Sequence, residues 1–326
     1  MTRRLRIAFY APGASVHTRR WVESIADRGH QVLLISQGRT DPLRVPVFDP
    51  YAGMGALGRL PKFRALVAGR LILRHLAEWQ PDLVHLHWLN PTLGTWWLAR
   101  RIDRLFISVW GRDIVWDGRE REPWLHRLCK KGILARGVTI TATSRFLAER
   151  TGAFVRPKRP IEVVPFGVDC ELFHPSADPQ ERAVPVIGYL KHYTAKYGPD
   201  ILLRACALLV ERGYSFRLLM HGTGDPGPYR KLARELGLET RTQFTGTVEH
   251  ASVPDKMRGF DIYAMPSVAD SETFGVSALE AAACGVPVVA SRVGGVPETV
   301  LDQETGLLVA PGRPEEIGRA SCRERV

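Results

Sequence analysis

Residues 271–298 read SETFGVSALEAAACGVPVVASRVGGVPE, which predicts a loop, a short helix, a buried strand and a second glycine-rich loop. The helix is expected to begin at Val276 or Ser277 and to end before Gly285 and Pro287. Its N-terminus therefore follows the Gly275 turn directly. Free backbone N–H groups there carry a partial positive charge of about half a unit, which makes this end a seat for an anion.

Two glutamates flank that seat. Glu272 lies on the approaching loop, and Glu280 lies about one turn inside the helix, with Phe274 and Gly275 between them. Carboxylates placed this way can accept hydrogen bonds from the hydroxyls of a ribose and a sugar. The alternative is a pair of solvated glutamates on a surface helix, because spacing alone is weak evidence.

Length and composition indicate a globular protein of two α/β domains. The chain has 326 residues, of which 45% are hydrophobic. No apolar run approaches the roughly 18 residues that span a bilayer, and the basic start MTRRLRIAFYAP is followed by too short an apolar part for a signal peptide. Five cysteines without a CxxC spacing indicate isolated thiols in a reducing cytosol rather than disulfides or a zinc site.

Charge is unevenly shared between the halves of the chain. Residues 1–165 hold 28 Lys and Arg against 13 Asp and Glu, whereas residues 166–326 hold 17 against 21. All eight tryptophans lie between Trp21 and Trp124. A basic, tryptophan-rich half suggests an anionic partner. Because no nucleic-acid-binding motif accompanies the charge, a membrane surface or an acidic substrate is favoured over nucleic acid.

The first half begins with a strand, a glycine turn, a helix and a strand, at residues 5–10, 13, 16–28 and 31–35. This order predicts a parallel sheet. The turn is not a GxGxxG, and no acidic residue ends the second strand, which disfavours dinucleotide binding. Residues 60–80, with Arg64, Arg70 and Arg74, read as a basic amphipathic helix that either packs on the sheet or rests on anionic lipid.

Two histidines end the next predicted strand, residues 82–88. Alternation places His85 and His87 on one face of it. A metal pair lacks a third ligand in the sequence, and the plainer interpretation is a strand-end histidine with a hydrogen-bond partner. A role at an acceptor pocket also stays open, because the carboxyl ends of parallel strands line the ligand crevice in such sheets.

The stretch 271–298 resembles the signature of the retaining glycosyltransferases of family 4, and the resemblance extends over roughly residues 5–318. IEVVPFGVDCELFHP, residues 161–175, is similar to the family's interdomain crossing. The resemblance implies the GT-B fold: two doubly wound, Rossmann-like α/β domains facing across a cleft. It implies an N-terminal acceptor-side domain at 1–168, a hinge or linker at 169–184 and a nucleotide-sugar-binding domain at 185–318. Residues 319–326 form an atypical tail, so a C-terminal truncation is expected.

The implied activity is glycosyl transfer from a nucleotide-sugar donor to an acceptor hydroxyl with retention of configuration, in cell-surface glycan or glycolipid synthesis. No cofactor and no metal are expected, because cationic groups would hold the donor diphosphate. A lipid-linked or glycan acceptor implies a cytoplasmic enzyme, with a peripheral position at the inner membrane face as a further hypothesis. The alternatives are an isomerase resembling the UDP-sugar 2-epimerases and a nucleotide-sugar-binding protein without catalysis.

The family's usual Gly-Arg is replaced here by Gly188 and Tyr189, so Lys191 is the nearest basic residue and Lys196 fits the family's lysine. Lysine lacks the bidentate fork of arginine. The resemblance assigns catalytic roles to these two lysines and to Glu272. The expected donor-binding residues are Gly13, Ala14, Gly222, Gly224, Thr247, Val248, Phe274, Gly275, Val276 and Glu280.

Five residues of the first half are expected on the acceptor side: His17, His85, His87, Trp110 and Asp113. In many family members a histidine that faces the transferred sugar precedes the glycine at 111, and here Trp110 stands in its place. Asp113 matches the family's acidic residue, either as a ligand contact or as an acceptor that fixes its own loop.

Overall fold

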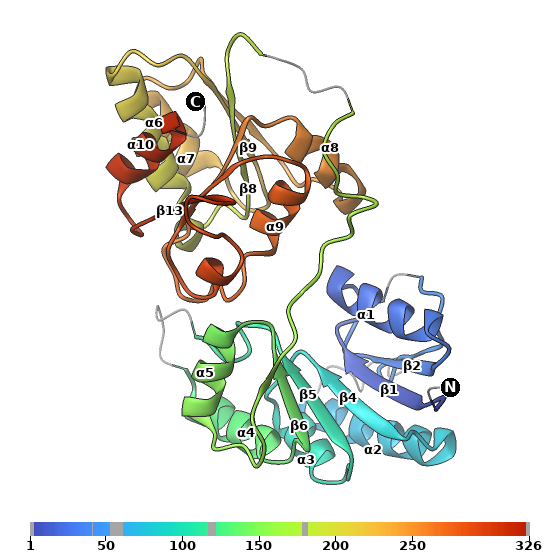
Figure 1. Ribbon diagram of the computed structural model, residues 1–326. Helices are drawn as coiled ribbons and strands as arrows, with labels where there is room; N and C mark the ends of the chain where they lie inside the picture. The colour runs from blue at the N-terminus through green and yellow to red at the C-terminus, as the bar shows by residue number, and fades with distance from the viewer. Residues whose placement is uncertain (1–2, 41, 53–60, 117–121, 178–181, 324–326) are drawn as a thin grey trace. The chain divides into compact units, whose positions relative to one another are not determined.

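The computed structural model describes residues 3–40, 42–52, 61–116, 122–177 and 182–323, with side chains at 61–66 and 322–323 excepted. The chain divides into two compact units, Met1–Val164 and Pro165–Val326. That division falls inside the crossing segment 161–175, a few residues before the expected domain end at 168. Figure 1 colours the chain from blue to red, and each unit is described by itself.

The first unit contains a sheet of seven parallel strands in the order β3-β2-β1-β4-β5-β6-β7. The predicted parallel pairing of the first two long strands is confirmed, with Ile7 opposite Val32. The strands are β1 (Arg6–Ala11), β2 (Gln31–Ser36), β3 (Val47–Phe48), β4 (Leu83–His87), β5 (Leu105–Val109), β6 (Thr139–Ala142) and β7 (Glu162–Val163).

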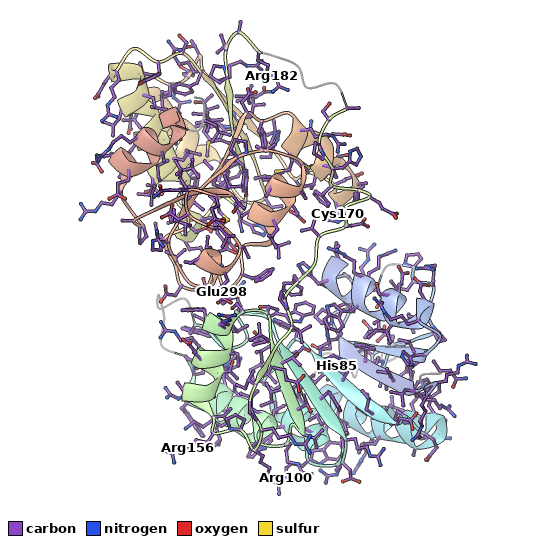
Figure 2. All side chains as sticks on the ribbon, viewed as in Figure 1. His85, Arg100, Arg156, Cys170, Arg182 and Glu298 are labelled. Carbon is purple, nitrogen blue, oxygen red and sulfur yellow. The ribbon has the colours of Figure 1, made fainter. Side chains whose placement is uncertain are left out.

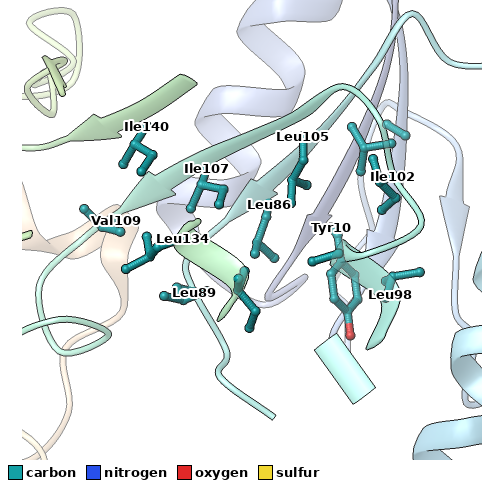
Figure 3. Close-up of a cluster of buried hydrophobic side chains, with 14 of the residues drawn as sticks. Tyr10, Leu86, Leu89, Leu98, Ile102, Leu105, Ile107, Val109, Leu134 and Ile140 are labelled. Carbon is teal, nitrogen blue, oxygen red and sulfur yellow. The ribbon is translucent and has the colours of Figure 1, made fainter. Parts of the chain in front are cut away.

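Alternate residues of β1 serve two separate cores, as the two-residue repeat of a strand requires. Ile7 and Phe9 pack toward α1 (Val16–Asp27), where Val22 is fully buried. Ala8 and Tyr10 belong to the larger core on the opposite face, part of which is drawn in Figure 3. That core is covered by α2 (Pro61–Trp79), α3 (Leu93–Ala99), α4 (Trp124–Leu134) and α5 (Arg145–Phe154). A parallel sheet covered on both faces explains why its strands are continuously apolar.

Helix boundaries follow the sequence signals. The Ser144 hydroxyl accepts a hydrogen bond from the Leu147 N–H at 3.1 Å and so caps the N-terminus of α5. Helix α2 is also confirmed and packs on the sheet through Ile72 and Leu76. The side chain of Arg64 lies outside the described residues.

The second unit contains six parallel strands in the order β10-β9-β8-β11-β12-β13. They are β8 (Val186–Leu190), β9 (Arg217–His221), β10 (Thr242–Thr245), β11 (Ile262–Met265), β12 (Val288–Ser291) and β13 (Gly306–Val309). The α-helices are α6 (Pro199–Glu211), α7 (Gly227–Glu235), α8 (Val253–Arg258), α9 (Val276–Ala283) and α10 (Pro314–Arg323). Three single 3₁₀ turns are η2 (Ala195–Tyr197), η3 (His250–Ser252) and η4 (Val296–Glu298).

Helices cover both faces of this sheet. One core lies under α6, α7 and α10, and the other lies under α8 and α9 (Figure 1). Helix α10 crosses residue 319, where the atypical tail was expected to start, and Ala320 and Ser321 are buried within it. The predicted end of α9 is also confirmed, because Gly285 has φ +74° just after the helix.

Candidate functional site

Helix α9 begins at Val276, which confirms the predicted start. The preceding residue, Gly275, has φ +83°, a left-handed conformation that glycine adopts without strain. The Thr299 hydroxyl lies 3.0 Å from the carbonyl oxygen of Phe274 and supports the turn from the other side. The first N–H groups of α9 are therefore presented on the side of the sheet where β11 ends.

An ion pair joins two of the predicted catalytic side chains. The Lys191 ammonium donates to the Glu272 carboxylate, with 2.7 Å between Nζ and Oε2. These side chains stand 81 positions apart in sequence and are only 14% and 11% exposed. Burial by itself lowers the pKa of Lys191, but the Glu272 carboxylate together with Tyr263 and Tyr197 more than offsets it, so the pKa of Lys191 is raised.

Two glycine loops hold the backbones of this pair in place. A Cβ at Gly222 would overlap the Lys191 carbonyl oxygen, and a Cβ at Gly294 would overlap the carbonyl oxygen of Glu272. The Gly295 N–H also donates to that Glu272 carbonyl at 3.1 Å. The sequence places glycines where the neighbouring loops must approach closely, and the ion pair depends on that approach.

Lys196 lies in the same group. Its ammonium is 4.6 Å from the centre of the Tyr197 ring, and the Lys191 ammonium is 5.1 Å from the same centre. The Lys196 carbonyl accepts from the Val268 N–H at 2.9 Å, which ties η2 to the segment after β11. The structure therefore brings both predicted lysines to one aromatic ring.

Tyr197 and Tyr263 belong to this group although the sequence analysis did not single them out. The Tyr263 hydroxyl donates to the Leu190 carbonyl at 3.3 Å. Burial raises the pKa of Tyr263 to about 12; Lys191 acts in the opposite direction, and Glu272 and Glu280 raise it further. The hydroxyl thus lies near all three charged groups. Its place in the buried strand that precedes the stretch 271–298 was the available signal.

The other expected donor-binding loops meet at the neighbouring strands. The Lys191 N–H donates to the His221 carbonyl at 3.1 Å, and the Gly222 N–H donates to Gly246 at 3.3 Å. Gly222 therefore lies between the Lys191 turn and the loop that carries Thr247 and Val248. Gly224, in the same loop as Gly222, has φ +100°. The Thr247 side chain is exposed, and Val248 packs partly against the core.

In the first unit, Gly13 and Ala14 form the turn before α1. Gly13 is buried, and a Cβ there would overlap the Thr40 hydroxyl and crowd Ser36. Ala14 is exposed. The close packing of this turn on Ser36 and Thr40 explains the glycine without reference to a ligand.

Aromatic rings gather at the ends of β4 and β5. The ring of His87 lies 4.6 Å from Trp110 and 4.9 Å from His85, measured between centres. His17 lies 5.7 Å from Trp110, and Trp21 lies 5.0 Å from His87. The structure thus brings four of the five predicted acceptor-side residues together; His85 is labelled in Figure 2.

The two histidines of β4 are neutral at pH 7. Burial lowers the pKa of His85 to about 4, and burial together with His85 and His17 lowers the pKa of His87 well below its usual range. His85 Nε2 lies 2.7 Å from the Ser108 hydroxyl, as expected of a strand-end histidine with a partner. Neither ring nitrogen of His87 has a hydrogen-bond partner among the described residues, and the residue is fully buried.

Asp113 fixes its own loop. Its carboxylate accepts hydrogen bonds from the backbone N–H groups of Leu89, Trp110 and Gly111, at 3.1, 3.0 and 2.7 Å. Burial raises the pKa of Asp113, and these donors offset part of that increase. The side chain is only 3% exposed, so its observed role is to position the Trp110 turn.

Within the part of the chain that the structure describes, no group of three His, Cys, Asp or Glu side chains is arranged to hold a metal ion. In that same part, none of the helices combines the length and the apolar character needed to cross a bilayer.

Family comparisons cover both units. Residues 12–172 match the family described as "Glycosyltransferase Family 4", and residues 176–321 match "Glycosyl transferases group 1". A D-inositol 3-phosphate glycosyltransferase of Rhodococcus erythropolis is 31% identical, over 94% of this chain and 77% of that protein. The protein of the same name from Actinosynnema mirum is 29% identical, over 96% of this chain and 84% of that one.

Solved structures resemble the whole chain. A glycosyltransferase from Rickettsia africae has a TM-score of 0.79 at 20% identity, covering 99% of this chain and 89% of that one. Sucrose-phosphate synthase from Thermosynechococcus elongatus has a TM-score of 0.79 at 23% identity, covering 98% and 89%. Anabaena HepE in complex with UDP-glucose has a TM-score of 0.74 at 22% identity, covering 98% and 90%.

Proposed function

This chain belongs to glycosyltransferase family 4 and has the GT-B fold, and we propose that it moves a sugar from a nucleotide-sugar donor to an acceptor hydroxyl with retention of configuration. The observation that carries the proposal is the group formed by Lys191, Lys196 and Glu272 beside the first turn of α9. Cations, a carboxylate and free N–H groups are the chemistry that a sugar diphosphate requires.

The donor diphosphate would bind at the cationic side of this group. Lys191 and Lys196 provide two ammonium groups near one ring, and the N–H groups that follow Gly275 provide a partial positive charge. Negative charge builds on the diphosphate as the sugar–phosphate bond breaks, so these groups stabilise the transition state more than the ground state. We expect them to do so without a divalent metal.

The two glutamates would hold the hydroxyls. Glu280, which lies near Tyr263, would accept from the ribose. Glu272 and the backbone around Phe274 and Gly275 would hold the transferred sugar. Gly222, Gly224, Thr247 and Val248 would border the nucleotide, because their loops adjoin the Lys191 turn.

Retention rests on the family resemblance. We propose attack from the face that the diphosphate leaves, with the departing phosphate accepting the proton of the acceptor hydroxyl. No enzymatic nucleophile is assigned. Neither an isomerase nor a non-catalytic binding protein uses an acceptor. Transfer of the donor sugar to any acceptor would therefore exclude both alternatives.

For the acceptor we propose a carbohydrate hydroxyl on a glycan or lipid-linked glycan. The partly exposed rings of Trp21, His85 and Trp110 form a surface suited to a sugar ring, whose C–H face packs on aromatic groups, and the buried His87 ring contacts all three. A phosphorylated inositol is the second candidate, because relatives about 30% identical carry the name D-inositol 3-phosphate glycosyltransferase.

A cytoplasmic enzyme at an anionic membrane surface fits the exposed residues of the first unit. Trp124 is 76% exposed on α4, with exposed Leu125 and Leu128 beside it and exposed Arg127 and Lys131 along the same helix. Tryptophan with basic residues on one helical face is typical of interfacial binding.

On α2, the exposed Arg74 is paired with Glu78 at 2.9 Å, which weakens its attraction for lipid. The described part of α2 therefore supports membrane binding less strongly than α4 does.

The test is product formation from UDP-glucose, and from other nucleotide sugars, with glycan, lipid-linked glycan and inositol phosphate acceptors. A product whose new bond keeps the donor's anomeric configuration, as read by NMR, would support the proposal. Release of free nucleotide without any glycosylated acceptor, or an inverted bond, would contradict it.

A further inference from the structure

The Lys191–Glu272 ion pair neutralises the charge of both side chains. The Lys191 ammonium contacts the Glu272 carboxylate at 2.7 Å, and both side chains are largely shielded from water. The glycine loops at 222 and 294 hold the two backbones where they are. A ligand phosphate that draws the Lys191 ammonium to itself therefore competes with the Glu272 carboxylate for this cation.

A buried carboxylate that loses its cation is strongly disfavoured unless other donors replace it. A nucleoside diphosphate offers only phosphate oxygens at this point, and these repel the carboxylate. A nucleotide sugar offers hydroxyl donors from its sugar as well. Only the nucleotide sugar can draw Lys191 away from Glu272 and still supply a partner for each of these side chains.

We propose that Glu272 is a specificity-determining residue, whose carboxylate holds Lys191 in the absence of sugar and releases it only to a donor whose sugar hydroxyls bind that carboxylate. The inference rests on the proposed function, because it assumes that Lys191 receives the donor diphosphate. It goes further in assigning Glu272 a second role, discrimination against ligands that carry a diphosphate and no sugar.

Product release follows from the same arrangement. Transfer removes the sugar and leaves the nucleoside diphosphate in the site. Glu272 then lacks its hydroxyl partners, and its carboxylate competes with the phosphate for Lys191. Lys196 has no such carboxylate contact among the described residues and continues to bind phosphate until the product leaves.

Inorganic pyrophosphate is the direct probe, because it carries the diphosphate without a base or a sugar. Glu272→Gln keeps the shape of the side chain and removes its charge, so the variant should bind pyrophosphate about tenfold to a hundredfold more tightly than the wild type in calorimetry. Glu235→Gln is the matched control, since it removes one carboxylate from an exposed ion pair with Lys231 on α7 of the same unit. The control should keep the wild-type affinity.

A second arm compares UDP with UDP-glucose, or another base where the wild type prefers it. The dissociation constant of UDP divided by that of UDP-glucose should fall at least about tenfold in Glu272→Gln. The reason is that UDP binds this variant more tightly, whereas UDP-glucose loses a hydrogen-bond partner. Wild-type melting behaviour, checked first by calorimetry, shows that the variant is folded. The double variant Glu272→Gln with Lys191→Met should lose the increased affinity for pyrophosphate and UDP that Glu272→Gln shows alone.

Unchanged or weaker pyrophosphate binding in folded Glu272→Gln would overturn the inference. An equal increase in pyrophosphate affinity in Glu235→Gln would also overturn it, because the effect would then come from the net charge of the protein. Tighter pyrophosphate binding in Glu272→Gln alone, in a protein that binds no nucleotide sugar, would support the role of Glu272 in holding Lys191. It would at the same time refute the proposed nucleotide-sugar donor.

Discussion

Acid should destabilise the first unit through the two histidines of β4, His85 and His87. Burial lowers the pKa of His85 to about 4, whereas an unfolded histidine has a pKa near 6.5. Between these values the unfolded chain binds a proton that the folded unit excludes. The contribution of His85 to the free energy of unfolding is therefore fully present above about pH 6.5 and is lost as the pH falls toward 4.

The size of the effect follows from the shift. One pKa unit corresponds to about 1.4 kcal/mol, so His85 should remove about 2 kcal/mol by pH 5 and about 3 kcal/mol by pH 4. His87 acts in the same direction, because burial, His85 and His17 all lower its pKa. The expected slope from His85 is about 1.1 kcal/mol per pH unit between pH 4.5 and 6, and His87 makes the dependence steeper.

Tryptophan fluorescence reports this unit selectively, because all eight tryptophans lie between residues 21 and 124. Urea unfolding of the whole chain, followed by that signal from pH 4.5 to 7.5, gives the free energy of unfolding at each pH. His85→Asn removes the titrating ring and keeps a group that can bond the Ser108 hydroxyl. His75→Asn, on α2 in the same unit, measures what removal of any histidine does to the slope.

His85→Asn should reduce the slope by about 1.1 kcal/mol per pH unit between pH 4.5 and 6, relative to the His75→Asn variant. Carboxylates that protonate in the same range contribute equally to all the proteins and cancel in this difference. Equal slopes in the two variants would show that His85 is not held neutral by burial, and the account of the β4 histidines would be wrong.

Three further outcomes are expected. Glu280→Ala should weaken UDP-glucose binding by about 1–3 kcal/mol in calorimetry, since it leaves a ribose hydroxyl unpaired; unchanged affinity would remove Glu280 from the donor site. Lys196→Ala should lower kcat about a hundredfold, while EDTA leaves wild-type activity intact; activity lost in EDTA and restored by magnesium would contradict metal-free transfer. Trp124→Ser with Leu128→Ser should reduce flotation with anionic vesicles, and Leu301→Ser, an exposed control in the second unit, should not. Binding that neutral vesicles match, or that high salt leaves unchanged, would contradict the electrostatic part of that hypothesis.

Local signals predicted the elements well because each rests on a few neighbouring residues. Gly275 and Gly285 bracket α9, and both have the positive φ that only glycine adopts easily. The βαβ order at the start of the chain requires a parallel pair, and β1 and β2 form it.

Side-chain pairing was beyond the sequence. The predicted roles of Lys191 and Glu272 were both toward a ligand, and nothing in the spacing of 81 positions indicates that they contact each other. That contact depends on two glycine loops from other strands. The role of Asp113 could not be predicted either. Whether it contacts a ligand or fixes its own loop depends on which backbone N–H groups lie near its carboxylate, and the sequence does not give this.

The positive charge of the first half belongs to its surface rather than to the ring cluster at β4. The tryptophan rings there carry no charge, burial lowers the pKa values of His85 and His87, and the Asp113 carboxylate accepts from backbone N–H groups. Arg70, Arg127 and Lys131, by contrast, lie exposed on α2 and α4. A charge excess on helices attracts an anionic surface over a distance, but it does not choose which hydroxyl reacts. Under the proposed function, the basic half would bear on where the enzyme works and the rings at β4 would bear on what it glycosylates, so the two hypotheses need separate experiments.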